Sequence, residues 1–241
     1  MSKRNKKILT ILLVIVVCVL TGMAVYNVIG NVGGDKDDIT VYFVRHARTD
    51  ANDAGILAGC ETDAKITDEG SKLAKKTGEY LSDVKFDTVY TSTLSRTKDT
   101  ASIILDANKN STPAISQLAI LNDVNWGRAA GLTPYEAGQK YPDFSEDNYL
   151  GTIDNNNFES PIGATSKYTK VKNFENVLEQ VIATTPSGGN ALVVGHSSFV
   201  WLLQSMFPNQ VNASDALSNT SVTVLKYNDG RWTLDQLNYN P

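Results

Sequence analysis

The two histidines of this chain, His46 and His196, each follow a short run of branched apolar residues. Donor side chains crowd the turn around His46, where Arg45, Arg48 and Asn52 lie close together in the sequence. An arginine presents a planar fork of N–H groups that matches phosphate oxygens, and it stays charged at any working pH. Packing alone gives little reason to place such groups there, although a histidine at a strand end is often structural. The turn is therefore a candidate anion-binding site.

A second candidate anion-binding residue is Arg96, in the first turn of a helix predicted over residues 94–106. A cation there opposes the helix dipole, at a cost of a few tenths of a kcal/mol up to ~1. An anionic ligand would explain it, and a solvated surface arginine is the alternative. His196 mirrors His46, and the small residues around it would let backbone N–H groups approach an anion. The alternative is a histidine without a chemical role at a capped helix start.

Strands and helices alternate along the part of the chain that carries these residues. The predicted strands cover residues 39–44, 88–90, 114–121, 191–194, 221–227 and 232–237, and the predicted helices cover 67–82, 94–106, 168–182 and 199–206. This order predicts an α/β fold, a three-layer sandwich with a mostly parallel central sheet, helices on both faces and a C-terminal antiparallel hairpin. Residues 142–163 predict a long loop. Ligands bind beyond the carboxyl ends of such strands, so we expect both histidine turns to meet at one crevice.

Composition limits the kind of site. The formal charge of -4 gives no whole-chain reason to expect nucleic-acid binding, so a phosphate site must be a local basic pocket. The only cysteines are Cys18 and Cys60, and no CxxC pair exists, which excludes a Cys-rich zinc site. We expect no metal and no other cofactor. Cys60 is expected to be a free loop thiol, with a disulfide-linked homodimer as the alternative.

Residues 1–30 have the pattern of a membrane segment. Four basic residues precede 19 uncharged residues from Ile8 to Tyr26, close to the ~20 that cross a bilayer as a helix. Basic residues before the span favour a cytoplasmic N-terminus and a following domain outside. A retained signal anchor is predicted, and cleavage after Ala24, which would release a secreted domain, is the alternative. Residues 31–38 predict a linker and residues 39–241 a globular domain.

The motif at residues 45–52, Arg-His-Ala-Arg-Thr-Asp-Ala-Asn, resembles the Arg-His-Gly signature of the histidine phosphatase superfamily. The phosphoglycerate mutase-like branch of that family has the form RHGxTxxN. Further segments that resemble the family are Ile66–Gly70, Val89–Arg96, Thr100-Ala101, Leu121–Asp123, Phe158–Ser160 and Val194–His196. The resemblance covers essentially all of residues 39–227, and the ordered set is highly specific.

The resemblance implies a role for each of the basic side chains. His46 would attack phosphorus and become a phosphohistidine. Arg45, Arg96 and His196 would bind the phosphoryl oxygens, with Asn52 assisting. The attacking imidazole must be neutral, and its other nitrogen needs an acceptor that fixes the tautomer. A backbone carbonyl of the same turn is the expected acceptor.

The resemblance also places an acid/base carboxylate at Asp123, where the family usually has Glu. Asp123 would protonate the leaving oxygen and later activate water, and Glu136 is the alternative acid. Two further departures are Ala47 in place of Gly and Arg48 in place of a residue that is often Glu. Both are predicted to alter substrate preference. Arg48 indicates either an additional anionic group on the substrate or an outward-pointing, solvated arginine.

The predicted function is that of an extracytoplasmic, metal-independent phosphomonoester phosphatase that acts on a small phosphorylated substrate. A phosphoglycerate mutase-type phosphotransferase is the alternative within the same chemistry. Its cytosolic substrates disagree with the predicted location, and the 142–163 loop is a modest cover for a site that must retain an intermediate. A catalytically weak phosphate-binding module is the alternative from another class, indicated by Ala47 and by Asp123 in place of Glu.

Overall fold

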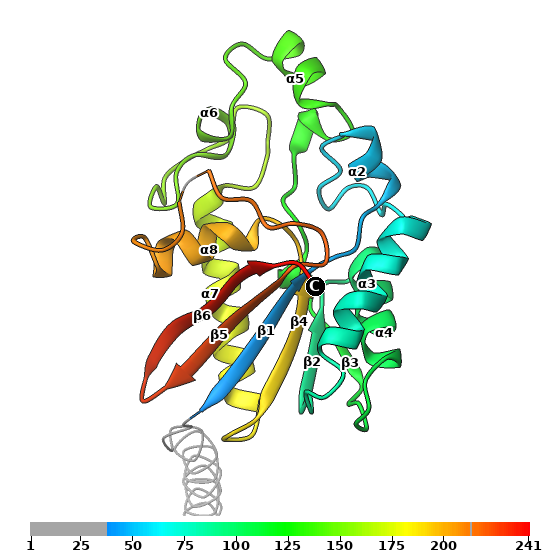
Figure 1. Ribbon diagram of the computed structural model, residues 1–241. Helices are drawn as coiled ribbons and strands as arrows, with labels where there is room; N and C mark the ends of the chain where they lie inside the picture. The colour runs from blue at the N-terminus through cyan, green and yellow to red at the C-terminus, as the bar shows by residue number, and fades with distance from the viewer. Residues whose placement is uncertain (1–37, 213) are drawn as a thin grey trace, which may run out of the picture. The chain divides into compact units, whose positions relative to one another are not determined.

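Six strands form one central sheet in the order β3-β2-β4-β1-β5-β6 (Figure 1). The computed structural model describes residues 38–212 and 214–241. The strands are β1 Ile39–Arg45, β2 Thr88–Thr91, β3 Ile115–Gln117, β4 Asn190–Gly195, β5 Val222–Asn228 and β6 Arg231–Tyr239. The neighbours from β3 to β1 pair in parallel, whereas β5 runs antiparallel to β1 and β6 antiparallel to β5. The predicted mostly parallel sheet with a C-terminal hairpin is confirmed.

Helices cover both faces of this sheet. Successive residues of a strand point to opposite sides, so each central strand contributes side chains to two apolar clusters. Phe43 and Val193 pack in one apolar cluster with α7 (Lys167–Thr184) and α8 (Phe199–Met206). Val44 and Val194, one residue further along, pack in a second cluster with α4 (Ser95–Asp106). Helix α3 (Asp68–Tyr80) packs against α4. The predicted three-layer sandwich is therefore confirmed, and the central strands are apolar on both faces.

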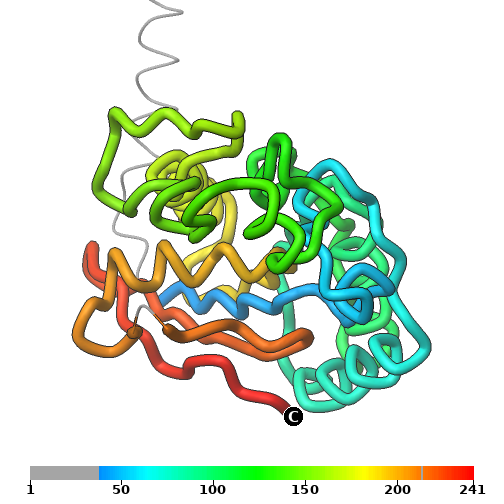
Figure 2. Tube along the Cα trace, turned by 90° about the horizontal axis from the view of Figure 1, so that it is seen from above, coloured from blue at the N-terminus to red at the C-terminus, as the bar shows by residue number. Residues whose placement is uncertain are grey.

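The segment from residue 119 to 165 lies beyond the carboxyl ends of the parallel strands (Figure 1). Seen from above, it lies on the side of α7 and away from β6 (Figure 2). It contains two 3-10 turns, η1 (Ala119–Leu121) and η2 (Gly127–Ala129), and two short helices, α5 (Pro134–Lys140) and α6 (Glu146–Leu150). A small apolar cluster that includes Tyr149 and Ile162 holds it together.

Two sequence-based predictions for this region are wrong. The predicted loop over 142–163 contains α6, because the Ser145 side chain accepts a hydrogen bond from the Asn148 backbone N–H (3.2 Å) and so caps the helix. The predicted strand over 114–121 is a strand only in its first half, because β3 ends at Gln117 and η1 follows.

The predicted membrane span lies outside the described residues, and so does the predicted linker except for its last residue, Asp38. Among residues 38–212 and 214–241, no helix is long and apolar enough to cross a membrane. Cys60 is a free, half-buried thiol. A disulfide-linked homodimer through Cys60 stays a prediction.

Candidate active site

The two histidines lie at the carboxyl ends of adjacent parallel strands. In the register of β1 and β4, Arg45 pairs with Gly195, and these are the last residues of the two strands. His46 directly follows β1, and His196 directly follows β4. The His46 backbone N–H donates to the Gly195 carbonyl (2.9 Å), and the two imidazole ring centroids are 5.2 Å apart. The predicted meeting of the two turns at one edge of the sheet is confirmed.

His46 is held in one tautomer. Its Nδ1 lies 2.8 Å from the carbonyl oxygen of Ala47, which can only accept, so Nδ1 carries the hydrogen and Nε2 keeps its lone pair. Burial first, and then the neighbouring His196 and Arg96, lower the pKa of His46 well below its usual 6.5. The ring is therefore neutral at pH 7 with one nitrogen available as a nucleophile. The expected backbone acceptor in the same turn is confirmed.

The residues after His46 hold the turn in place. Ala47 is fully buried and donates its backbone N–H to Thr100 Oγ1 (2.8 Å). Thr49 and Asn52 form a reciprocal capping box at the start of α2 (Asp50–Ala54), a short helix that the sequence analysis did not predict. The turn is therefore fixed both to α4 and to its own following helix.

Arg48 points away from this turn. Its side chain is half exposed and forms an ion pair with Asp53 on α2. It is not among the residues that line the cavity beside His46. Of the two alternatives left open by the sequence, the solvated arginine fits the structure and the extra anion contact does not.

Asn52 is oriented by two donors. Its amide oxygen accepts from the Thr49 backbone N–H (3.1 Å) and from the Asn219 side-chain amide (3.2 Å). The Asn52 amino group is thereby left for a ligand in the cavity that Asn52 lines. Asn219 also donates to the His46 carbonyl (2.9 Å), so it connects the turn to the loop before β5.

Arg45 presents a buried donor without a partner. Its Nη1 donates to the Leu217 carbonyl, whereas its Nε is buried and has no hydrogen-bond partner within the described part of the chain. Burial lowers the pKa of Arg45, yet a guanidinium stays charged in proteins. Buried donors are nearly always paired, so this group is suited to an anion.

Arg96 is 2% exposed at the first turn of α4, where the sequence predicted it. Its Nη1 donates to the Thr62 carbonyl (2.9 Å) and its Nη2 to the Gly59 carbonyl (2.8 Å). Gly59 has φ +57°, and a Cβ there would lie 2.4 Å from the Val124 carbonyl oxygen, so this loop requires glycine. The alternative of a solvated surface arginine is wrong.

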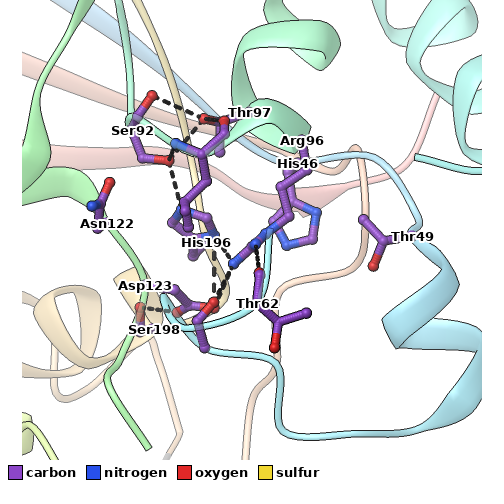
Figure 3. A network of polar contacts seen from close by, with 12 residues as sticks. His46, Thr49, Thr62, Ser92, Arg96, Thr97, Asn122, Asp123, His196 and Ser198 are labelled. Carbon is purple, nitrogen blue, oxygen red and sulfur yellow. Dashed lines mark hydrogen bonds and ion pairs between the residues drawn. The ribbon is translucent and has the colours of Figure 1, made fainter. Parts of the chain in front are cut away.

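His196 lies beside the Arg96 guanidinium (Figure 3). It is fully buried. Its Nδ1 is 3.4 Å from Arg96 Nη2, a donor, so Nδ1 accepts and Nε2 donates to Ser92 Oγ (2.9 Å). Burial, followed by the charges of Arg96 and Lys170, lowers the pKa of His196 well below 6.5. In this neutral tautomer His196 directs its lone pair toward Arg96 and its hydrogen toward Ser92.

Asp123 faces both Arg96 and His196 (Figure 3). One carboxylate oxygen accepts from Ser198 Oγ (3.1 Å), and the other lies 3.4 Å from Arg96 Nη2 and 3.7 Å from His196 Nδ1. The alternative acid, Glu136, is fully exposed and completes the capping box of α5 instead. Asp123 lines the cavity and Glu136 does not.

A cavity of about 150 Å³ opens beside these groups. It is lined by Arg45, His46, Thr49, Asn52, Ile56, Leu57, Ala58, Gly59, Arg96, Asp123, Trp126 and Ser197. Five of the six predicted site residues line it. The sixth, His196, does not line it and contacts Arg96 Nη2 (3.4 Å) instead. The arrangement can hold a compact oxyanion between two guanidinium groups, with a neutral imidazole and a carboxyl group beside it.

Lys170 is a residue near the site that the sequence analysis missed. It is 2% exposed on α7, and its Nζ donates to the Asn122 carbonyl next to Asp123. Burial lowers its pKa to about 8. The signal was present, because Lys170 lies one helical turn before Phe174 on the apolar face of its helix. Ser198 and Asn219 had no comparable signal.

Comparison with known proteins agrees with this geometry. The family described as "Histidine phosphatase superfamily (branch 1)" matches residues 41–240. The chain is 30% identical over 203 residues to a metal-independent phosphoserine phosphatase of Arabidopsis thaliana. The match covers 81% of this chain and 79% of that protein. It is 27% identical over 201 residues to a 2,3-bisphosphoglycerate-dependent phosphoglycerate mutase of Mesorhizobium japonicum. The match covers 83% of this chain and 92% of that protein.

Solved structures share the fold. A mycobacterial glucosyl-3-phosphoglycerate phosphatase in complex with VO3 superposes with a TM-score of 0.70 at 20% identity, over 83% of this chain and 98% of that one. With the family match over most of its length, this chain belongs to the histidine phosphatase superfamily, branch 1.

Proposed function

We propose that this protein is a phosphomonoester phosphatase that acts through a phosphohistidine at His46. The observation that carries the proposal is the Nδ1 contact of His46 with the Ala47 carbonyl, which leaves Nε2 as a neutral nucleophile beside Arg45 and Arg96. Phosphoryl transfer depends mainly on positioning and charge neutralisation, which two guanidinium groups can supply.

The reaction divides into two steps. In the first, His46 Nε2 attacks phosphorus, the ester P–O bond breaks, and Asp123 gives its proton to the leaving oxygen. In the second, the Asp123 carboxylate takes a proton from water as the water oxygen attacks phosphorus and the P–N bond breaks. Inorganic phosphate then leaves, and the enzyme returns to its initial protonation state. Arg45 and Arg96 hold the phosphoryl oxygens in both steps.

Hydrolysis rather than mutase activity is supported by the distribution of basic side chains. Arg45 and Arg96 both face one small cavity that fits a single phosphoryl group. A phosphoglycerate mutase-type reaction needs further cations for the substrate's carboxylate and second phosphate. A larger cavity shares Asp123, Trp126 and Ser197 with this one. Among the described residues, its lining contains no lysine, arginine or histidine.

The test is turnover of p-nitrophenyl phosphate in EDTA by the wild-type protein and by His46→Ala. We expect phosphate release that survives EDTA and is lost in the variant. Acid-quenched wild-type enzyme should carry acid-labile phosphate on His46. Failure to hydrolyse any of a broad set of phosphoesters would favour a phosphate-binding module, and phosphate exchange between phosphoglycerates without release would favour a mutase.

We also propose that the catalytic domain acts outside the cytoplasm, either anchored by residues 8–26 or released by cleavage after Ala24. The support is the basic stretch followed by a long uncharged run. Protease added to intact cells should digest the domain of the anchored form, and mass spectrometry of its N-terminus separates retention from cleavage. Protection of the domain in intact cells would contradict the proposal.

A further inference from the structure

A second cavity adjoins the one beside His46. It has a volume of about 380 Å³ and shares Asp123, Trp126 and Ser197 with the smaller cavity. Asp123, the proposed proton donor to the leaving group, therefore lines both cavities. A phosphate held by the arginines would direct the rest of its ester into the larger cavity.

The wall of this second cavity is acidic. Glu146 and Asp215 join Asp123 in its lining, which has no basic side chain among the residues that the structure describes. Glu146 pairs with Lys167 (3.3 Å), but Lys167 also pairs with Asp147 (2.8 Å), so that trio keeps one negative charge.

Asp215 receives its hydrogen bonds from uncharged donors. The backbone N–H and the side-chain amide of Asn212 both donate to its Oδ2 (2.8 and 3.5 Å). Asp215 therefore contributes a second negative charge to the wall. Like charges repel, so an anionic leaving group is disfavoured beside these carboxylates.

The remaining lining suits hydroxyl groups on a compact ring. Trp126 and Trp201 offer apolar ring surfaces, and the serine hydroxyls at positions 197 and 214 can donate or accept. The Ser198 hydroxyl donates to Asp123 and can still accept. The carboxylates accept hydrogen bonds from alcohol groups. The volume is at the small end of the roughly 300–1,000 Å³ of ligand pockets, which is sufficient for one sugar ring.

We propose that this second cavity binds the alcohol part of the substrate and selects an uncharged, hydroxyl-rich leaving group of monosaccharide size. The phosphate is then the only anionic group of the substrate. This inference rests on the phosphatase function proposed above and specifies its substrate class.

The experiment compares kcat/KM of the full chain for three substrates: glucose 6-phosphate, 3-phosphoglycerate and phosphorylcholine. These have neutral, anionic and cationic leaving groups, and p-nitrophenyl phosphate reports on the phosphoryl site. We expect glucose 6-phosphate to exceed 3-phosphoglycerate by at least tenfold. Hydrolysis of p-nitrophenyl phosphate together with a preference for 3-phosphoglycerate or phosphorylcholine would overturn this inference alone. Loss of all four activities would overturn the phosphatase function itself, and this inference with it.

Two variants of Asp215 test the charge argument. Asp215→Lys should lower the ratio of glucose 6-phosphate to 3-phosphoglycerate at least tenfold. Asp215→Asn, which keeps an oxygen for the Asn212 donors, should lower it less. Asp106→Lys makes the same charge change at the far end of α4 from Arg96 and should leave the ratio unchanged. A ratio in Asp215→Lys equal to that of the wild type and of Asp106→Lys would contradict the proposal.

Discussion

Removing the Ser198 hydroxyl should weaken proton donation by Asp123 without weakening phosphate binding. Ser198 Oγ donates to one Asp123 oxygen at 3.1 Å, while the other oxygen faces Arg96 at 3.4 Å. A hydrogen bond to a charged group contributes about 1.5–3 kcal/mol. We take the lower end, because Arg96 still restrains the carboxyl group in Ser198→Ala. About 1.4 kcal/mol corresponds to a tenfold change in rate.

The assay is a comparison of two leaving groups. A sugar alkoxide needs a proton as the P–O bond breaks, whereas p-nitrophenolate leaves as a stabilised anion. Ser198→Ala should therefore lower kcat for glucose 6-phosphate about tenfold, which is only a part of the roughly 10²–10⁴-fold that general acid catalysis contributes in full. For p-nitrophenyl phosphate kcat should change less than about twofold, since the proton contributes little to that step.

A matched control is Ser205→Ala, an exposed serine on α8, the helix that begins directly after Ser198. It should leave both rates unchanged. An equal fall with both substrates would contradict this role of Ser198, because the hydroxyl would then act on the phosphoryl group rather than on the leaving oxygen. Unchanged rates with both substrates would show that Asp123 does not depend on this bond.

Further predictions concern the acid and the buried titratable groups. Asp123→Asn should lower kcat for alkyl phosphates about 10²–10⁴-fold. Glu136→Ala should leave kcat unchanged, because Glu136 caps α5 and does not line the cavity. Steady-state kinetics of both variants checks these two predictions. The pKa values of His46 and His196 lie well below 6.5, so below pH 6.5 the unfolded chain binds protons that the folded chain does not. Stability should therefore fall on acidification, by up to about 1.4 kcal/mol per histidine and pH unit; urea unfolding at pH 7.5 and 5.5 measures it, and equal midpoints would contradict it. The pKa of Lys170 is lowered from 10.5 to about 8, so between these values stability should rise with pH, by about 3 kcal/mol in total. Lys170→Met should remove that rise in unfolding curves measured from pH 8 to 10, and a rise that persists in the variant would assign it to another group.

The sequence predicts best where local pattern and tertiary contact agree. Apolar runs ending at His46 and His196 identify parallel strands, and strand parallelism then brings the two turns together. The tautomer of His46 follows from a carbonyl only one residue away. These contacts are either local or imposed by sheet register, so they can be derived before the fold is known.

The contacts that escaped prediction join segments without a shared pattern. Ser198 meets Asp123 across 75 positions, and Asn219 meets His46 across 173 positions. Nothing in the local sequence of either polar residue indicates its partner. The helix α6 escaped for another reason, since its five residues lie among turn-forming Asn, Asp and Gly and are too few for a helical period.

The bonds of Asn219 have a consequence for how the domain responds to ligands. Groups that would contact one bound phosphate come from the first strand of the domain, from α4, and from a turn that Asn219 ties to the loop before β5. An oxyanion in this cavity therefore requires these distant segments of the described domain to be folded together, and it stabilises the native state by mass action. Inorganic phosphate should raise the melting temperature of the entire domain in one cooperative transition, so a thermal shift at this single site reports on global folding.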